Sequence, residues 1–170
     1  MNPPEFDPND EVTVEVVDHD APATDRSFAR RITLQVLYEI DTTQHTADEV
    51  IVARLEAQDP GRREARYVRF LVRSVLAQRD AIDNVIRQFV VEWPIEQIAK
   101  IDINILRMAI VEFAIEQKAP PGVVIDEAVG LARVFGSESS LRFVNGVLGK
   151  LVMDDEMLES LRALKKAGSL

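Results

Sequence analysis

The sequence contains no cysteine, which excludes disulfide bonds, thiolate nucleophiles and cysteine-based zinc sites. Its two histidines, His19 and His45, stand far apart in polar surroundings, and no calcium-binding loop is present, so no metal site is expected. Glycine-rich phosphate loops and a complete nucleophile elbow are also missing. We therefore expect no cofactor and no catalysis.

Long apolar runs are missing as well. No stretch approaches about 18 uncharged apolar residues, so no transmembrane helix is expected. The N-terminus lacks the basic and apolar segments of a secretory signal. The lack of cysteine is consistent with a reducing compartment. Together these absences favour a cytoplasmic protein without a membrane partner.

Lysine and arginine are absent from the first 25 residues, which carry eight acids. The whole chain has a net charge of −9, but the other 145 residues carry 21 acids and 20 bases, a net of −1. The negative charge therefore belongs to the N-terminal segment and does not argue against a nucleic-acid partner. Because residues 1–24 also contain four prolines and few large apolar side chains, we predict a disordered acidic tail there.

After the tail, every long segment has the period of a helix, and turn residues separate the segments. We predict an all-α fold of seven to eight helices. The expected helices are 26–40, 47–58, 62–91, 95–99, 102–117, 123–135, 139–152 and 154–166. The segment 102–117 is apolar nearly all round, so we expect a central buried helix.

Two helix faces have the chemistry of an RNA surface. On the first expected helix Arg31, Gln35 and Tyr38 share one face, where they offer a phosphate contact, base-edge hydrogen bonds and a stacking ring. On the third, arginines recur at spacings of four, three and four. This arginine stripe consists of Arg62, Arg66, Arg69 and Arg73.

The arginine stripe has more than one interpretation. Like charges on one helix face cost stability, which favours a role in binding RNA phosphates. The alternatives are an ordinary solvated face or a docking strip for the acidic tail. The face of Arg31, Gln35 and Tyr38 also has an alternative, an ordinary half-exposed amphipathic face, and periodicity alone favours that alternative.

Four blocks of the sequence, in the same order and spanning about 125 residues, resemble the NusB family. Residues 29–38, ARRITLQVLY, resemble the family's first-helix signature, and residues 102–112, DINILRMAIVE, resemble its central block. Residues 120–132, PPGVVIDEAVGLA, and 143–148, FVNGVL, resemble its later motifs.

The resemblance implies two packed helical subdomains, roughly residues 25–91 and 95–153, followed by a C-terminal helix and tail at 154–170. It implies a transcription antitermination factor that supports ribosomal RNA synthesis. Such a factor binds a boxA-type single-stranded RNA together with NusE, a small-subunit ribosomal protein, within the antitermination complex with RNA polymerase.

The resemblance also implies site residues. In the family the RNA surface includes the arginines at the start of the first helix. Together with the stripe, the candidate RNA-binding residues are Arg26, Arg30, Arg31, Gln35, Tyr38, Arg66, Arg69, Phe143 and Asn145. The partner-protein surface is implied around the start of the central helix, at Glu96 and at Asp102, which we expect to be exposed.

The chain departs from the family pattern where Ser27 and Phe28 replace arginines of the usual cluster, and where the acidic tail precedes it. Both departures weaken attraction to RNA. They leave an alternative, which is a protein-interaction module of the NusB fold with weak or no RNA binding. Ribosomal RNA cytosine methyltransferases use the same fold as an accessory domain, but that enzyme also needs a second domain and a catalytic cysteine.

Three further residues have a structural interpretation. Arg107 and Glu127 are predicted to belong to a buried ion pair or polar network rather than to a ligand site. Gly146 interrupts an expected helix at a cost of roughly 1 kcal/mol against alanine, so we predict that a neighbouring helix approaches closely there.

Overall fold

The computed structural model describes residues 25–167, so the predicted disordered tail over residues 1–24 lies outside the described residues. Within 25–167 the chain forms seven α-helices, one 3₁₀ turn and one π-helical turn, with no strand, and the all-α prediction is confirmed. The elements are α1 (Asp25–Thr42), α2 (Ala47–Gln58), α3 (Arg62–Phe89), η1 (Ile95–Gln97), α4 (Lys100–Ile110), η2 (Val111–Ile115), α5 (Pro121–Phe135), α6 (Ser140–Val152) and α7 (Asp155–Ala167).

The bounds of α2 follow from local chemistry. Its start is a capping box, in which the Thr46 hydroxyl accepts from the Glu49 N–H, while the Glu49 carboxylate accepts from the Thr46 N–H at 2.8 Å. Its end is set by Asp59, whose left-handed φ of 45° leads the chain into Pro60 and Gly61. The predicted helix at 47–58 has these same bounds.

The central segment differs from the single regular helix predicted over 102–117. After α4 the hydrogen-bond register widens into the π turn η2, Val111–Ile115. The Lys118 N–H then donates to the Glu112 carbonyl at 2.8 Å, and Gln117 adopts a left-handed φ of 51°. π turns are rare and often found at functional sites. This one leaves Glu112 buried in the core and Lys118 exposed just beyond the turn.

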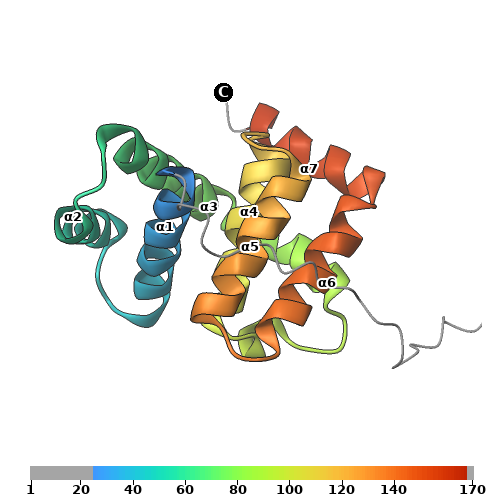
Figure 1. The fold of residues 1–170 in the computed structure, drawn as a ribbon. Helices are drawn as coiled ribbons and strands as arrows, with labels where there is room; N and C mark the ends of the chain where they lie inside the picture. Colours follow the sequence, from blue (N-terminus) through green and yellow to red (C-terminus); the bar gives the residue numbers. More distant parts are fainter. Residues whose placement is uncertain (1–24, 168–170) are drawn as a thin grey trace, which may run out of the picture.

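The long helix α3 joins the two sides of the molecule. In Figure 1, α1 and α2 lie on one side, α6 and α7 lie on the other, and α4 and α5 lie between them. With 28 residues, α3 is about 42 Å long, and it contacts α1 and α2 as well as α4, α6 and α7. No helix within residues 25–167 is long and apolar enough to cross a membrane.

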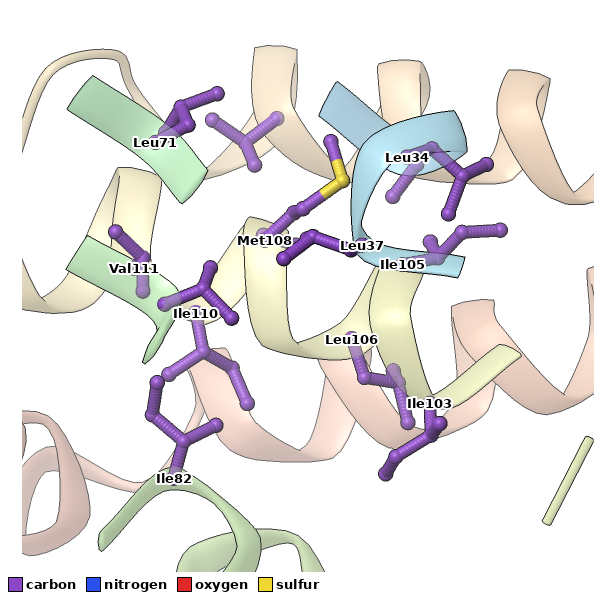
Figure 2. Packing of buried hydrophobic residues seen from close by; sticks show 14 of the residues in the cluster. Leu34, Leu37, Leu71, Ile82, Ile103, Ile105, Leu106, Met108, Ile110 and Val111 are labelled. Carbon is purple, nitrogen blue, oxygen red and sulfur yellow. The ribbon is translucent and has the colours of Figure 1, made fainter. Parts of the chain in front are cut away.

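The core is built around α4 and η2. Every residue from Asp102 to Ile115 is buried, as predicted for a central helix. Figure 2 shows Ile110 of α4 in one apolar cluster with Leu34 of α1 and Ile82 of α3. Each large aliphatic side chain in this cluster contributes about 1.5–3 kcal/mol on burial.

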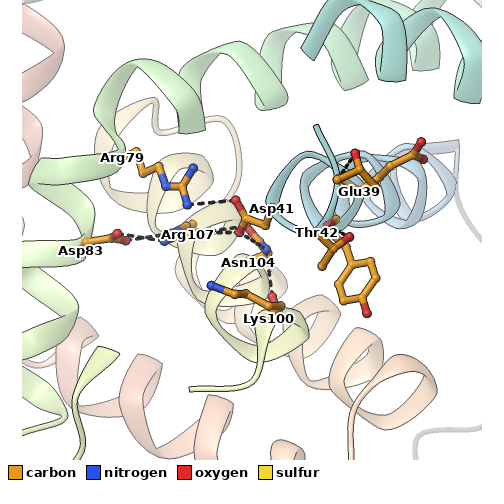
Figure 3. A network of polar contacts seen from close by, with 10 residues as sticks. Glu39, Asp41, Thr42, Arg79, Asp83, Lys100, Asn104 and Arg107 are labelled. Atoms are coloured by element: carbon orange, nitrogen blue, oxygen red, sulfur yellow. Dashed lines mark hydrogen bonds and ion pairs between the residues drawn. The ribbon is translucent and has the colours of Figure 1, made fainter. Parts of the chain in front are cut away.

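A buried polar network joins α1, α3 and α4 (Figure 3). Arg107 donates to both oxygens of Asp83 at 2.8 Å and to Asp41 at 3.0 Å. Asn104 donates to the same Asp41 oxygen at 2.9 Å, and Arg79 pairs with the other oxygen at 2.9 Å. Burial opposes the charge of Arg107, but Asp83 and Asp41 outweigh it and raise the pKa of Arg107. The predicted polar network around Arg107 is confirmed, and Asp41 stays within α1 instead of starting the loop.

Candidate nucleic-acid interface

A groove of about 540 Å³ opens where the start of α1 meets the first turns of α3 and the segment after η2. Its lining includes four basic and two aromatic side chains: Arg26, Arg63, Arg66, Lys118, Tyr67 and Phe70. Two acids, Asp25 and Glu64, also line it, so the charge of the lining is net positive. Within the described part of the chain, no group of three histidine or acidic side chains could hold a metal ion.

The groove brings together the two basic surfaces that the sequence suggests separately. Arg26 lies in the first turn of α1, and Arg66 belongs to the arginine stripe of α3. The two residues are 40 positions apart in the sequence, yet they line the same groove because α1 packs along α3. The stripe therefore borders the surface that the resemblance assigns to RNA.

Cation–π contacts organise the lining. The Arg26 guanidinium carbon lies 4.4 Å from the centroid of the Tyr67 ring, and the Lys118 ammonium lies 5.1 Å from that of Phe70. The two ring centroids are 6.0 Å apart. Arg26 also donates to the Lys118 carbonyl at 3.3 Å. The groove therefore carries alternating rings and cations, which suit the bases and phosphates of a nucleic acid.

Tyr67, Phe70 and Lys118 line the groove, although the sequence alone did not single them out. The Tyr67 ring is half-buried and packs partly against the core. The available signal was the position of Tyr67 and Phe70 directly after Arg66 and Arg69 on α3. Lys118 offered no such signal, because its place depends on the π turn.

Arg30 differs from the expected phosphate contact. It is only 4% exposed, and its Nε and Nη2 atoms donate to the Glu112 carboxylate at 2.9 and 2.5 Å. Its Nη1 atom lies 3.5 Å from Glu127. Despite burial, which opposes its charge, Glu112 and Glu127 raise the pKa of Arg30. The guanidinium is thus used inside the protein, and the predicted network around Glu127 is present.

The same buried carboxylate positions a ring of the groove. The Tyr67 hydroxyl donates to Glu112 at 2.5 Å. Burial, together with this hydrogen bond, raises the pKa of Tyr67, so the phenol keeps its proton and remains a donor. Arg30 and Glu112 are therefore positioning residues, since they hold the ring on which Arg26 lies.

The remaining candidates on α1 and α3 do not line the groove. Arg31 and Arg69 are exposed, and Tyr38 is 41% exposed. Gln35 is half-buried, and its side-chain oxygen accepts from Gln58 of α2 at 2.9 Å. Base-edge readout by Gln35 would therefore have to compete with an existing hydrogen bond.

The two candidates on α6 also lie outside the groove lining. Phe143 packs partly against the core, whereas Asn145 is exposed. The close helix approach predicted at Gly146 is wrong, because a Cβ atom added there would meet nothing within 4 Å. Gly146 and Asn145 instead form an open patch on the surface of α6.

The two partner-surface candidates differ in exposure. Glu96 is exposed in η1, with a carboxylate oxygen 3.7 Å from Arg87. The expected exposure of Asp102 is wrong, because it is only 7% exposed and its carboxylate accepts a hydrogen bond from Ser140 at the start of α6. Its Oδ1 atom has no hydrogen-bond partner among the described residues, and burial raises the pKa of Asp102.

The chain is similar to proteins of one family. The model of the NusB family matches residues 27–153. The transcription antitermination protein NusB of Dehalococcoides mccartyi is 44% identical over 129 residues, which are 75% of this chain and 90% of that protein.

Solved structures agree with this match. NusB of T. maritima aligns with a TM-score of 0.71 at 25% identity, over 79% of this chain and 96% of that chain. A structure of the antitermination factors NusB and NusE in complex with dsRNA aligns with a TM-score of 0.68 at 26% identity, over 74% of this chain and 94% of that chain.

Proposed function

The chain belongs to the NusB family of transcription antitermination factors, and we propose that its groove binds a boxA-type single-stranded RNA. It would do so without catalysis, in the cytoplasm, together with a NusE-like ribosomal protein. The assembly would act in the antitermination complex with RNA polymerase and support ribosomal RNA transcription. The observation that carries the proposal is the convergence of Arg26, Arg66 and two aromatic rings on one groove.

Each part of the lining has a separate task in this proposal. Arg26, Arg63, Arg66 and Lys118 neutralise phosphates, and each contact releases counterions from the RNA. Phe70 offers a face on which an unpaired base stacks. Tyr67, held by Glu112, keeps Arg26 in place on the groove wall.

The other candidates, which lie outside the groove, extend the proposed RNA surface. Arg31, Tyr38 and Gln35 continue along α1, and Arg69 continues along α3. The α6 pair, Phe143 and Asn145, forms a second surface for RNA. Glu96 is proposed for the NusE-like partner, and Asp102 would act there through the packing of α4 against α6.

A titration of the full chain with fluorescent boxA-type RNA tests the groove. Replacing Arg63 and Arg66 together by Gln should weaken binding and lower the slope of log K against log salt by about 1.4, at about 0.7 for each phosphate contact on a single strand. The control is the double variant Arg87→Gln/Arg162→Gln, because both arginines are exposed and lie outside the groove lining.

A second variant separates stacking from charge. Phe70→Leu should cost about 1–3 kcal/mol of RNA binding and leave the salt slope nearly unchanged. Because Phe70 packs partly against the core, the melting temperature is measured beside the affinity. Unchanged affinity and slope in Arg63→Gln/Arg66→Gln would move the RNA site away from the groove.

The alternative function is a protein-interaction module with weak or no RNA affinity. It is favoured by Ser27, which stands where the family has arginine and instead bonds Glu127 at 2.8 Å. A chain that binds a NusE-like protein but no boxA-type RNA, at any salt concentration and in the presence of that partner, would establish this alternative.

A further inference from the structure

The acidic N-terminal segment enters the fold at the groove itself. Residues 1–24 carry seven acids and no lysine or arginine: Glu5, Asp7, Asp10, Glu11, Glu15, Asp18 and Asp20. The next two residues, Asp25 and Arg26, line the groove. The most concentrated negative charge of the chain is therefore tethered beside its basic groove.

We propose that residues 1–24 occupy the groove in the absence of RNA and compete with RNA for its cations. The tail would place carboxylates where phosphates would otherwise bind, next to Arg63, Arg66 and Lys118. This inference rests on the proposed function for its consequence, which is regulation of RNA binding. The contact between the tail and the groove does not depend on whether the groove binds RNA.

The length of the tether is sufficient for this contact. The five residues from Asp20 to Asp25 span at most about 18 Å, so the carboxylate of Asp20 can reach the groove that begins at Asp25. A tether of so few residues gives an effective concentration in the millimolar range. Contacts that would be negligible for a free acidic peptide are therefore populated within one chain.

The lining has cations available for the tail. The groove lining holds four basic side chains and two acidic ones. Arg62 and Arg69, which lie on α3 like Arg63 and Arg66, are also exposed. Arg63 and Arg66 are exposed, so bringing carboxylates to them requires little desolvation. Such contacts weaken as salt shortens the Debye length, from about 30 Å at 0.01 M to about 8 Å at 0.15 M.

The experiment compares three full-length chains. In the neutralised chain, all seven acids of residues 1–24 are replaced by Asn or Gln. In the exchanged chain, each of these Asp residues becomes Glu and each Glu becomes Asp, so the charge is preserved. The third chain is left unchanged. Neutralisation should tighten boxA-type RNA binding at least about threefold at low salt, with the difference vanishing near physiological salt. The exchanged chain should behave like the unchanged one.

A second comparison separates occupancy of the groove from general repulsion between tail and RNA. If the tail lies in the groove, neutralising it should have little effect in the Arg63→Gln/Arg66→Gln background. An equal gain in both backgrounds would show long-range repulsion and would overturn the proposal. Equal RNA affinity of the neutralised and unchanged chains at every salt concentration would overturn it as well.

A measurement without RNA tests the contact directly. Carbodiimide joins carboxylates to lysines that lie within ion-pair distance, and Lys118 is the lysine of the groove. In the unchanged chain at low salt, we expect peptides of the tail joined to Lys118 and not to Lys150 on α6. Absence of the Lys118 product would refute the contact. A chain that shows this product but binds no RNA would instead contradict the proposed function.

Discussion

The buried pair of Arg30 and Glu112 allows a quantitative test of how the groove is held. Arg30 is 4% exposed and Glu112 is 1% exposed, and the carboxylate accepts from Arg30 and from the Tyr67 hydroxyl. Glu112→Gln keeps the shape of the side chain but removes its charge. Among the acids of residues 25–167, Glu127 at 3.5 Å would then be left to balance the Arg30 cation in a buried site.

The expected magnitude follows from the cost of an unbalanced buried charge. Removing one partner of a buried pair typically costs about 3–5 kcal/mol of unfolding free energy. Because Glu127 compensates partly, we expect about 3 kcal/mol for Glu112→Gln and more for Arg30→Met, which leaves the carboxylate uncompensated. A domain of this size has a total stability of about 5–15 kcal/mol, so either loss is large.

The double variant Arg30→Met/Glu112→Leu distinguishes pairing from packing. It removes both charges and keeps a similar volume, so it should cost less than either single variant. The remaining cost, about 1–3 kcal/mol, comes from the Tyr67 hydroxyl, which loses its acceptor. With Arg30→Met and Glu112→Leu as the matching single variants, the two substitutions should therefore be coupled by about 3 kcal/mol or more rather than additive.

Urea unfolding followed by far-ultraviolet circular dichroism measures these values, because the described chain is almost entirely helical. A cost below about 1 kcal/mol for Glu112→Gln, or additive single variants, would refute the account of this pair. RNA affinity measured on the same folded samples should fall in Glu112→Gln, since Tyr67 and Arg26 would lose their positioning.

Three further predictions concern stability. Asp102→Asn should raise the unfolding free energy at pH 7, because burial raises the pKa of Asp102 and its charged form therefore opposes folding. This gain should disappear below about pH 4, where Asp102 is protonated in both the folded and the unfolded chain. An equal gain at pH 7 and at about pH 3.5 would contradict the prediction. Gly136→Ala should lower the unfolding free energy measured in urea by about 1–3 kcal/mol, because the new Cβ would lie 2.5 Å from the Ser140 Cβ and 2.6 Å from the Ala132 carbonyl oxygen. The matched control is Gly146→Ala, where nothing lies within 4 Å of the new Cβ, and it should raise the unfolding free energy by up to about 1 kcal/mol. Thr46→Ala should lower the melting temperature by removing about 1 kcal/mol of capping energy, with Thr42→Ala as an exposed control that is not a cap.

The helices could be predicted from the sequence because their signals are local. Apolar periodicity marks each buried face, and breakers such as Asp59, Pro60 and Gly61 act within a few residues of where they stand. The bounds of α2 were therefore predicted without error. The central burial of α4 was predictable for the same reason, since an apolar surface on all sides needs cover on all sides.

The reason why glycine occupies position 136 could be found only from the tertiary structure. A glycine after a helix suggests a left-handed residue, but its φ is −89°, which any residue can adopt. Glycine is required there because Ser140 and the Ala132 carbonyl approach too closely for a side chain. A close approach depends on how the chain turns in space, which a residue type alone does not specify.

The groove itself was decided by tertiary packing. Neighbouring arginines on α1 have opposite roles, since Arg31 is exposed while Arg30 is enclosed by Glu112. Periodicity tells which side of a helix is polar, but it cannot tell which charged group a distant acid will neutralise. The sequence by itself determined a helical chain with basic and acidic segments. Only the packing of α1 against α3, and the π turn that contains Glu112 and precedes Lys118, decided which cations and rings form one surface.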